Sequence, residues 1–182
     1  MSKHEVDLII HSVCFAPLRY RKNAVRDRLI LSLLYYTGIR RNELLNLNWT
    51  DINLSKSNMI IRSGKGNKDR FIPIHKNVSR LLDKYLEERL PIETEALISG
   101  SRGKRMCVGS FVNLLNMYLL ISGLKKKGYS AHSFRHSFAT HLVESGVDIF
   151  KVQSLLGHAS LDTTRVYINF NSTQMAKAVE RL

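Results

Sequence analysis

Apolar residues recur at helical spacing from the start of the chain. Ser2 and Glu5 have the form of a capping box, in which the Ser2 side chain accepts the backbone N–H of Glu5 and the Glu5 side chain accepts that of Ser2. The apolar residues from Val6 to Val13 follow at the spacing of one helix face. The basic stretch Arg19–Lys22 interrupts this pattern. The chain is therefore predicted to begin directly with an amphipathic helix.

The same period continues over most of the chain, and glycines punctuate it. The residues expected to point inward in the first long segment are Leu29, Ile30, Leu33 and Leu34. Gly38 ends that segment. Helices are predicted over Ala24–Tyr36, Arg41–Leu47, Asn77–Glu88, Val108–Ser122, Ser133–Ser145, Ile149–Leu156, Leu161–Tyr167 and Thr173–Arg181.

Two short segments change to the composition and period of strands. Met59–Ile61 and Arg70–Ile74 are predicted strands, and the turn Ser63–Asp69 between them is rich in glycine and asparagine. Trp49–Ile52 is a candidate third strand of the same sheet. We therefore expect an α+β fold, mainly α with one small antiparallel sheet, as a single domain over residues 1–182.

The chain carries a large excess of positive charge. Lysine and arginine number 28 against 15 aspartate and glutamate residues, a formal net charge of +13. This excess favours a polyanionic partner, most simply nucleic acid, and a basic but otherwise ordinary soluble protein is the alternative. Cys14 and Cys107 have no metal-ligand spacing, so neither a zinc site nor a disulfide framework is expected, and the cytoplasm is the simplest location. No apolar run approaches the roughly 18 residues that suggest a membrane span.

Two motifs in the first half of the chain stand out. Arg40 lies at the break between two predicted helices and Glu43 follows one turn later, so their side chains share a face. An ordinary surface ion pair is the alternative. Lys65 lies at the hairpin tip between Gly64 and Gly66, which let the loop approach a phosphate closely. A solvated turn is the alternative for this loop.

Two further motifs lie in the second half. His132 and Arg135 are three residues apart near the start of a predicted helix, so they point the same way, and the apolar face of that helix would hold them at the rim of the core. His158 follows a glycine, and Tyr167 lies nine residues further on. Taken singly, such a histidine is more often a packed core residue, and Tyr167 would be a half-buried aromatic.

In chain order the residues singled out are Arg40, Lys65, His132, Arg135, His158 and Tyr167. This order resembles that of the tyrosine recombinase (phage integrase) family, which includes the Xer recombinases and lambda integrase. The matching phrases are Thr-Gly-Ile-Arg-Arg-Asn-Glu-Leu, Gly-Lys-Gly-Asn-Lys-Asp-Arg, His-Ser-Phe-Arg-His-Ser-Phe-Ala-Thr-His and Leu-Leu-Gly-His. The resemblance extends from about Glu5 to Arg181 and is greatest to Xer-like and mobile-element members.

The resemblance implies the tyrosine recombinase fold and cleavage and rejoining of double-stranded DNA. Tyr167 would attack a phosphodiester and form a 3′-phosphotyrosine link, which a 5′-hydroxyl later reverses. Arg40 and Arg135 would hold the phosphate oxygens, because arginine offers bidentate geometry and permanent charge. No ATP is expected, since the covalent intermediate stores the energy of the broken bond. No metal is expected either, since the arginines would stabilise the charge in its place, and no other cofactor or small-molecule ligand is expected.

The resemblance assigns further roles. Lys65 would be the general acid for the leaving 5′-oxygen, with Lys68 as a rival, because a lysine can give up its proton. His132 would assist removal of the tyrosine proton, His158 would hydrogen-bond the phosphate, and Glu43 would orient neighbouring groups. Weaker candidates for DNA contact are Arg41, Lys125, Lys126 and Lys127, for which plain solvation is the alternative.

Family members form a homotetramer in the synaptic complex, and a monomer is compatible with the isolated protein. They also carry an N-terminal core-binding domain, which is expected to be absent here, so the chain is expected to be a fragment or else a naturally short relative that drives DNA inversion. The segment Asn171–Leu182 would pack on a neighbouring protomer or on its own core. Integration or excision of a mobile element at the nucleoid is the expected outcome, without membrane association.

Three other functions remain as alternatives. A catalytically inactive accessory DNA-binding protein on this fold would carry a broken catalytic set. A type IB topoisomerase shares the chemistry but relaxes supercoils without a partner strand. A basic helical scaffold or RNA-binding protein would form no covalent DNA adduct.

Overall fold

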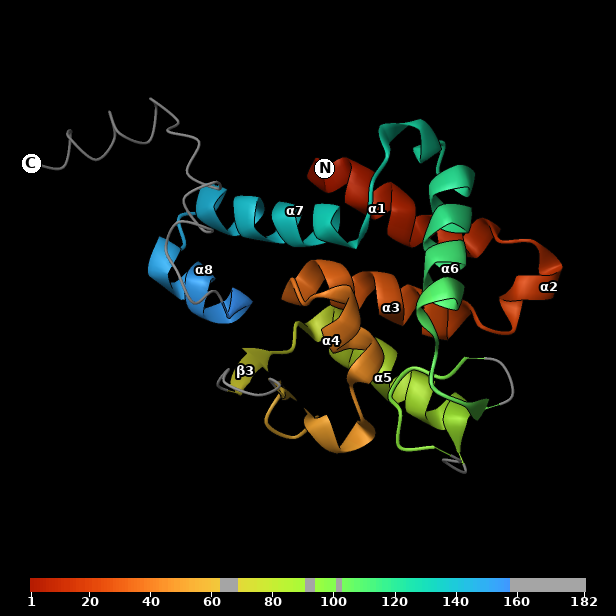
Figure 1. Cartoon of the computed structure of the whole chain (residues 1–182), viewed down its shortest axis with the longest axis horizontal. Helices are drawn as coiled ribbons and strands as arrows, with labels where there is room; N and C mark the ends of the chain where they lie inside the picture. Colours follow the sequence, from red (N-terminus) through yellow and green to blue (C-terminus); the bar gives the residue numbers. More distant parts are fainter. Residues whose placement is uncertain (63–68, 91–93, 101–102, 158–182) are drawn as a thin grey trace, which may run out of the picture.

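The computed structural model describes residues 1–62, 69–90, 94–100 and 103–157. Figure 1 shows the order of its elements. The α-helices are α1 (Lys3–His11), α2 (Leu18–Arg21), α3 (Ala24–Thr37), α4 (Arg41–Asn46), α5 (Lys76–Arg89), α6 (Val108–Ile121), α7 (Ala131–Glu144) and α8 (Ile149–Leu156). The strands are β1 (Ile52–Asn53), β2 (Asn58–Ile61) and β3 (Arg70–Pro73), and the 3₁₀ turns are η1 (Ser12–Phe15), η2 (Trp49–Asp51) and η4 (Lys125–Lys127). The predicted fold class, mainly α with a small antiparallel sheet, is confirmed.

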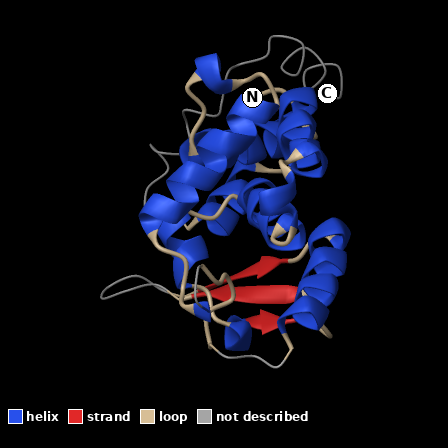
Figure 2. Ribbon diagram, turned by 90° about the vertical axis from the view of Figure 1, so that its right-hand side faces the viewer, coloured by secondary structure: helices blue, strands red, loops and turns tan. Residues whose placement is uncertain are grey.

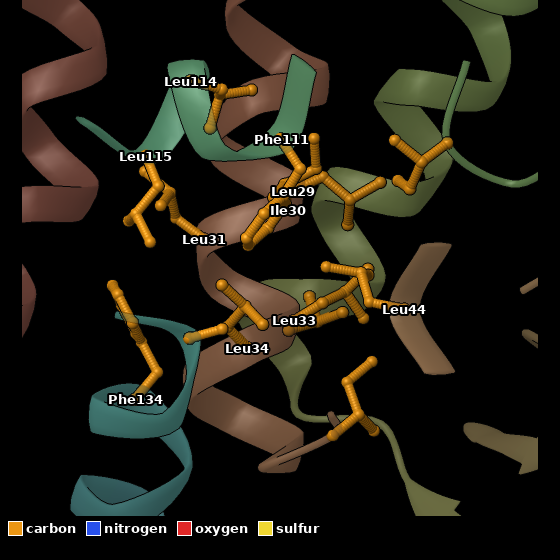
Figure 3. Packing of buried hydrophobic residues seen from close by; sticks show 14 of the residues in the cluster. Leu29, Ile30, Leu31, Leu33, Leu34, Leu44, Phe111, Leu114, Leu115 and Phe134 are labelled. Atoms are coloured by element: carbon orange, nitrogen blue, oxygen red, sulfur yellow. The ribbon is translucent and has the colours of Figure 1, made fainter. Parts of the chain in front are cut away.

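Helix α3 lies at the centre of the hydrophobic core. Every residue from Leu29 to Leu34 is buried, so this helix is enclosed all round rather than along one stripe. It packs against α1, α5 and α7, and Figure 3 shows its side chains between Phe111 of α6 and Phe134 of α7. Each fully buried leucine or isoleucine side chain contributes roughly 1.5–3 kcal/mol to folding. The residues predicted to point inward are confirmed, and Leu31 joins them.

The three strands form an antiparallel sheet in the order β1-β2-β3, which lies at one end of the molecule (Figure 2). Ile61 of β2 pairs with Arg70, so Arg70 begins β3 where the hairpin returns to the sheet. Burial alternates along β3, because Ile72 is buried while Phe71 and Pro73 are exposed. Arg70 therefore occupies the inward side of the strand.

The predicted cap of the first helix is confirmed. Ser2 donates its backbone N–H to Glu5 Oε2 at 2.8 Å, and the Glu5 N–H donates to Ser2 Oγ at 3.1 Å. The predicted helices within the described residues also form, with ends that differ only slightly. The predicted ranges Leu161–Tyr167 and Thr173–Arg181 lie outside the described residues. Within the described part of the chain, no helix is long and apolar enough to cross a membrane.

One local expectation was wrong in its bounds. A third strand joins the sheet, but it begins at Ile52, and Trp49–Asp51 before it is a 3₁₀ turn. Asp51 accepts the backbone N–H of Asn48 at 2.9 Å, and this local bond competes with strand pairing. The predicted interruption of the first helix is confirmed, because α1 ends at His11, and the chain forms the separate short helix Leu18–Arg21 at the basic stretch.

Candidate active site

The turn between α3 and α4 places Arg40 at the start of a helix. Gly38 ends α3 in a left-handed conformation, with φ of +61°. A Cβ at this position would overlap the ring of Phe138 and come within 3.0 Å of Leu156 Cδ2, so the turn has no room for a side chain. Ile39 is fully buried, and Arg40 follows in an extended conformation as the N-cap residue of α4.

Gly38→Ala should destabilise the protein more than Gly128→Ala. Both glycines have a left-handed backbone and end a helix, and alanine in that conformation costs about 1–2 kcal/mol. Among the described residues, no heavy atom lies within 4 Å of a Cβ placed at Gly128, so the loss of stability in Gly128→Ala should stay in that range. The clash at Gly38 should add about 1–3 kcal/mol. Urea unfolding measures both values, and equal losses would contradict the close packing of the Gly38 turn.

Glu43 holds Arg40 by its backbone and by its side chain. Glu43 Oε2 accepts the backbone N–H of Arg40 at 2.8 Å, and Oε1 accepts its guanidinium at 2.9 Å. The prediction that these two residues share a helix face is therefore confirmed. The Glu43 side chain is only 15% exposed, whereas that of Arg40 is 42% exposed. The carboxylate is thus fixed in the protein while the guanidinium remains accessible, which an ordinary surface pair would not provide.

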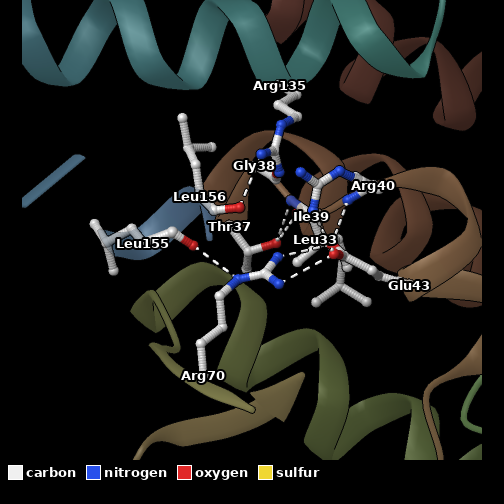
Figure 4. A network of polar contacts seen from close by, with 10 residues as sticks. All are labelled: Leu33, Thr37, Gly38, Ile39, Arg40, Glu43, Arg70, Arg135, Leu155 and Leu156. Atoms are coloured by element: carbon white, nitrogen blue, oxygen red, sulfur yellow. Dashed lines mark hydrogen bonds and ion pairs between the residues drawn. The ribbon is translucent and has the colours of Figure 1, made fainter. Parts of the chain in front are cut away.

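Arg70, which the motifs alone did not single out, binds the same carboxylate from β3. Its two terminal nitrogens donate to the two oxygens of Glu43 at 3.0 and 2.7 Å, and its Nε donates to the carbonyl of Leu155 at 3.0 Å (Figure 4). Its side chain is 9% exposed. The alternation of side chains along a strand could have indicated the role of Arg70. It places Arg70 on the same inward face as Ile72, where a charged group needs a partner. We call Arg40, Glu43 and Arg70 the Glu43 cluster.

The pKa of Glu43 lies below its ordinary value. Burial alone would raise the pKa of this carboxyl, but hydrogen bonds from Arg70 and Arg40 favour the charged form and outweigh burial. The stability contributed by this charge is complete above the pKa of a glutamate in the unfolded chain, about 4.3. It is lost as the pH falls through the lowered folded-state pKa, so Glu43 stabilises the cluster at neutral pH.

Arg135 extends from α7 to the same turn. It is 5% exposed, and its two terminal nitrogens donate to the carbonyls of Gly38 at 2.7 Å and Leu156 at 2.8 Å. Figure 4 shows its side chain directed from α7 towards the turn after α3. Arg70 and Arg135 thus bind successive carbonyls, those of Leu155 and Leu156, at the C-terminal end of α8. A helix C-terminus carries partial negative charge, which favours cations at this position.

His132 and Arg135 differ in their exposure to solvent. His132 is exposed in the first turn of α7, whereas Arg135 is buried one turn later. The expected burial of the apolar face is confirmed for Phe134 and Phe138, which fix α7 against its neighbours. His132 and Arg40 line one cavity of about 270 Å³, together with apolar side chains of α6. Two residues remote in the sequence therefore face a common space.

Part of the expected catalytic set is not placed by the structure. Lys65, Lys68, His158 and Tyr167 lie outside the described residues. Gly157, which precedes His158, ends α8 with φ of +65°. Within the residues that the structure describes, no group of three or more His, Cys, Asp or Glu side chains is arranged to hold a metal ion.

The weaker DNA-contact candidates occupy two surfaces. Arg41 is half-buried beside Arg40, donates to the Asn42 side chain at 3.2 Å and lines the same cavity. Lys125–Lys127 form the exposed turn η4 after α6, where Lys125 donates to the side chain of Asn116. These groups supply positive charge on the described surface, and their contact with DNA stays a prediction.

Comparison with known proteins gives consistent matches. The model of the phage integrase family matches residues 1–174. The tyrosine recombinase XerA of Pyrococcus furiosus is 42% identical over 163 residues, which cover 88% of this chain and 56% of the relative. The tyrosine recombinase XerD of Staphylococcus epidermidis is 35% identical over 178 residues, 95% of this chain and 59% of the relative. This chain thus spans little more than half the length of these curated relatives.

Solved structures share the fold. A crystal structure of XerA recombinase superimposes with a TM-score of 0.81 at 30% identity, over 100% of this chain and 64% of that chain. The XerH recombinase bound to its difH substrate gives a TM-score of 0.83 at 29% identity, over 98% of this chain and 52% of that chain. The fold is thus that of tyrosine recombinase catalytic domains. The chain belongs to the phage integrase family.

Proposed function

We propose that this chain is the catalytic domain of a tyrosine recombinase, which cleaves and rejoins double-stranded DNA at specific sites through a 3′-phosphotyrosine intermediate. One observation carries the proposal. Arg135 donates to the carbonyl of Gly38, so an arginine from α7 meets the turn that leads into Arg40. Two guanidinium groups at one turn suit a phosphodiester, because negative charge grows on its non-bridging oxygens in the transition state.

The two arginines act through preorganised charge. Both are held by protein groups before any DNA binds: Arg40 by Glu43, and Arg135 by the carbonyls at the ends of α3 and α8. Groups fixed in this way do not have to reorganise during the reaction. A donor directed at the developing charge is worth about 3–4 kcal/mol, which is roughly a hundred- to thousand-fold in rate.

Tyr167 is the proposed nucleophile. Its hydroxyl oxygen forms a bond to phosphorus, and the bond from phosphorus to the 5′-oxygen breaks. Lys65 donates a proton to that leaving oxygen, and Lys68 is its rival for the role. In the second step a 5′-hydroxyl attacks the phosphotyrosine, and the tyrosine recovers its proton. The net exchange of phosphodiester bonds needs no ATP because bond energy is conserved in the intermediate.

The remaining residues support this chemistry. His132 assists removal of the Tyr167 proton, and its place on the cavity that Arg40 also lines supports that role. His158 hydrogen-bonds the phosphate, and it follows directly after Gly157 at the end of α8, the helix whose carbonyls Arg135 binds. Glu43 orients Arg40.

Double-stranded DNA is the proposed substrate, bound as a homotetramer in the synaptic complex. The net charge of +13 supports DNA binding, and so does a structure of the related XerH bound to its difH substrate. Arg41 and Lys125–Lys127 would contact phosphates outside the reacting centre. We place this activity in the cytoplasm, at the nucleoid, and propose integration or excision of a mobile element as its outcome.

An inactive accessory protein and a type IB topoisomerase are less well supported. An accessory protein would have no need of the connected set of Arg40, Glu43 and Arg135, which the structure keeps together. A topoisomerase would share this set, and the two activities differ only in whether a second duplex exchanges strands. The test must therefore detect both the covalent adduct and strand exchange.

Covalent capture tests the proposal directly. The protein is incubated with fragmented genomic DNA that includes the flanks of its gene, the mixture is denatured in detergent, and protein-linked DNA is recovered and sequenced. We expect recovery at a discrete site, with the DNA joined to the protein by its 3′-phosphate and a free 5′-hydroxyl. A pair of plasmids that carry this site should then exchange strands. Absence of linked DNA would refute the proposal, and relaxation without exchange would indicate a topoisomerase.

A further inference from the structure

We propose that Arg70 is a positioning residue for Arg40, which acts by fixing Glu43 and by keeping the cluster positively charged. The inference rests on the proposed function, in which Arg40 contacts the scissile phosphate. Arg70 lies at the base of the hairpin, with a side chain 9% exposed, and both of its terminal nitrogens donate to Glu43, the carboxylate that also binds Arg40. We therefore assign its effect to Glu43 and Arg40 rather than to direct contact with DNA.

Glu43 is shared between the two arginines in a symmetrical way. Its Oε1 accepts from the Arg40 side chain at 2.9 Å and from Arg70 at 3.0 Å. Its Oε2 accepts from the Arg40 backbone at 2.8 Å and from Arg70 at 2.7 Å. The bidentate bond from Arg70 fixes the plane of the carboxylate, and that plane determines where the Arg40 N–H and guanidinium can bind. Loss of Arg70 would leave Arg40 as the remaining partner of Glu43 within the described residues.

The second effect is electrostatic. Two guanidinium groups and one carboxylate leave the Glu43 cluster with a net charge of +1. Without Arg70, the charges of Arg40 and Glu43 would cancel, and a phosphate at Arg40 would meet a neutral pair. Arg70 thus allows Glu43 to hold Arg40 without neutralising the positive charge that a phosphate needs.

Arg70 also joins this cluster to the end of α8. Its Nε donates to the Leu155 carbonyl, and its side chain lies directly against Gly157, where an added Cβ would come within 2.9 Å of Arg70 Cδ. Gly157 has φ of +65°, so a side chain there would be strained as well as crowded. One side chain therefore connects β3, α4 and the C-terminus of α8 (Figure 4).

The geometry requires arginine rather than lysine. The acceptors are two carboxylate oxygens and a carbonyl on another helix, and the planar guanidinium donates to all of them at once. A lysine ammonium has the same charge but cannot reproduce this planar fork. Arg70→Lys should therefore keep the net charge of the cluster and lose part of the orientation, whereas Arg70→Gln should lose both.

A first experiment measures the position of Arg40 without DNA. Amide hydrogen exchange of the Arg40 N–H, which donates to Glu43, is compared in the wild type, Arg70→Gln, Arg70→Lys and Arg62→Gln. Arg62 is the matched control, because it follows β2 in the same hairpin and binds the carboxylate of Asp51 at 2.7 Å, away from the cluster. We expect exchange at Arg40 to be about ten-fold faster or more in Arg70→Gln, intermediate in Arg70→Lys and unchanged in Arg62→Gln.

A second experiment measures the reaction. Single-turnover cleavage is followed at saturating DNA on the site recovered by covalent capture. Arg70→Gln should slow cleavage about ten- to hundred-fold with little change in the Kd for DNA. Because Arg70 acts through Arg40, it should cause less than about a three-fold further loss when Arg40 is already Ala. A residue that only stabilises the fold would give independent, multiplicative losses and a lower unfolding temperature.

The outcomes separate the two proposals. Equal exchange at Arg40 in Arg70→Gln and Arg62→Gln would overturn the positioning role, and so would multiplicative losses with Arg40→Ala. If Arg70→Gln does not fold, Arg70→Lys provides the same comparisons. If the wild type forms no DNA adduct, the proposed function fails, and the exchange measurement still decides whether Arg70 holds Arg40 in place.

Discussion

Replacing Tyr167 with phenylalanine should abolish the covalent DNA adduct and leave DNA binding intact. The substitution removes a single oxygen, the atom that would attack phosphorus, and keeps the aromatic ring. The positive charge that attracts the DNA backbone is unchanged, so the Kd and its dependence on salt should remain as in the wild type. The measurement is denaturation-resistant retention of labelled DNA beside native binding on the same substrate.

Tyr20→Phe is a suitable control for this experiment. Tyr20 lies on α2, at the opposite end of α3 from the Arg40 turn, and its ring is covered by the guanidinium of Arg19. This variant should form the adduct at the wild-type rate. An adduct that persists in Tyr167→Phe would show that another residue is the nucleophile, and peptide mapping of the linked DNA would identify it.

The second large effect is expected at Arg135, where stability and catalysis should fall together. Arg135→Gln leaves a buried site with one side-chain amide in place of two charged donors to the carbonyls of Gly38 and Leu156. A buried carbonyl left without its partner costs about 1–3 kcal/mol. Loss of the positive charge should in addition slow cleavage about a hundred- to thousand-fold. Urea unfolding and single-turnover cleavage measure the two effects.

Arg40→Gln separates these two effects. Arg40 is 42% exposed and binds only Glu43 within the described residues, so its loss should cost less than about 1 kcal/mol of stability. Its effect on cleavage should match that of Arg135→Gln. Wild-type cleavage by either variant would contradict the proposal that both arginines act on the phosphate. If only Arg135→Gln lost cleavage, the loss would be explained by disruption of the turn at Gly38 rather than by a missing contact with the phosphate.

Local patterns were sufficient for most of the secondary structure. The capping box at Ser2 and the inward positions of Leu29, Ile30, Leu33 and Leu34 depend on residues within one or two helical turns, where spacing decides which side chains meet. The segment at Trp49 was misassigned because it satisfies the composition of a strand, whereas the Asp51 side chain bonds locally to the Asn48 backbone. A competing bond of this kind is not visible in apolar periodicity.

Local sequence patterns predicted only part of the Glu43 cluster. The pairing of Arg40 with Glu43 follows from a spacing of three residues and was predicted. The pairing of Glu43 with Arg70 was not predicted, because it joins α4 to β3, which are far apart in the sequence. Alternation along β3 placed Arg70 on the inward side, which indicates that the arginine has a partner, but does not identify the partner.

The sequence by itself determined the helical and strand periods, the helix caps and the residue types and order of the proposed catalytic set, since each depends on chemistry or on short separations along the chain. Only the tertiary structure decided that Glu43 serves two arginines, that Arg135 is buried while His132 is exposed, and that Arg70 and Arg135 bind successive carbonyls of α8. The reason is physical. A buried charge takes the acceptors that packing brings to it, and packing here brings together the ends of α3, α8 and β3 from distant parts of the chain.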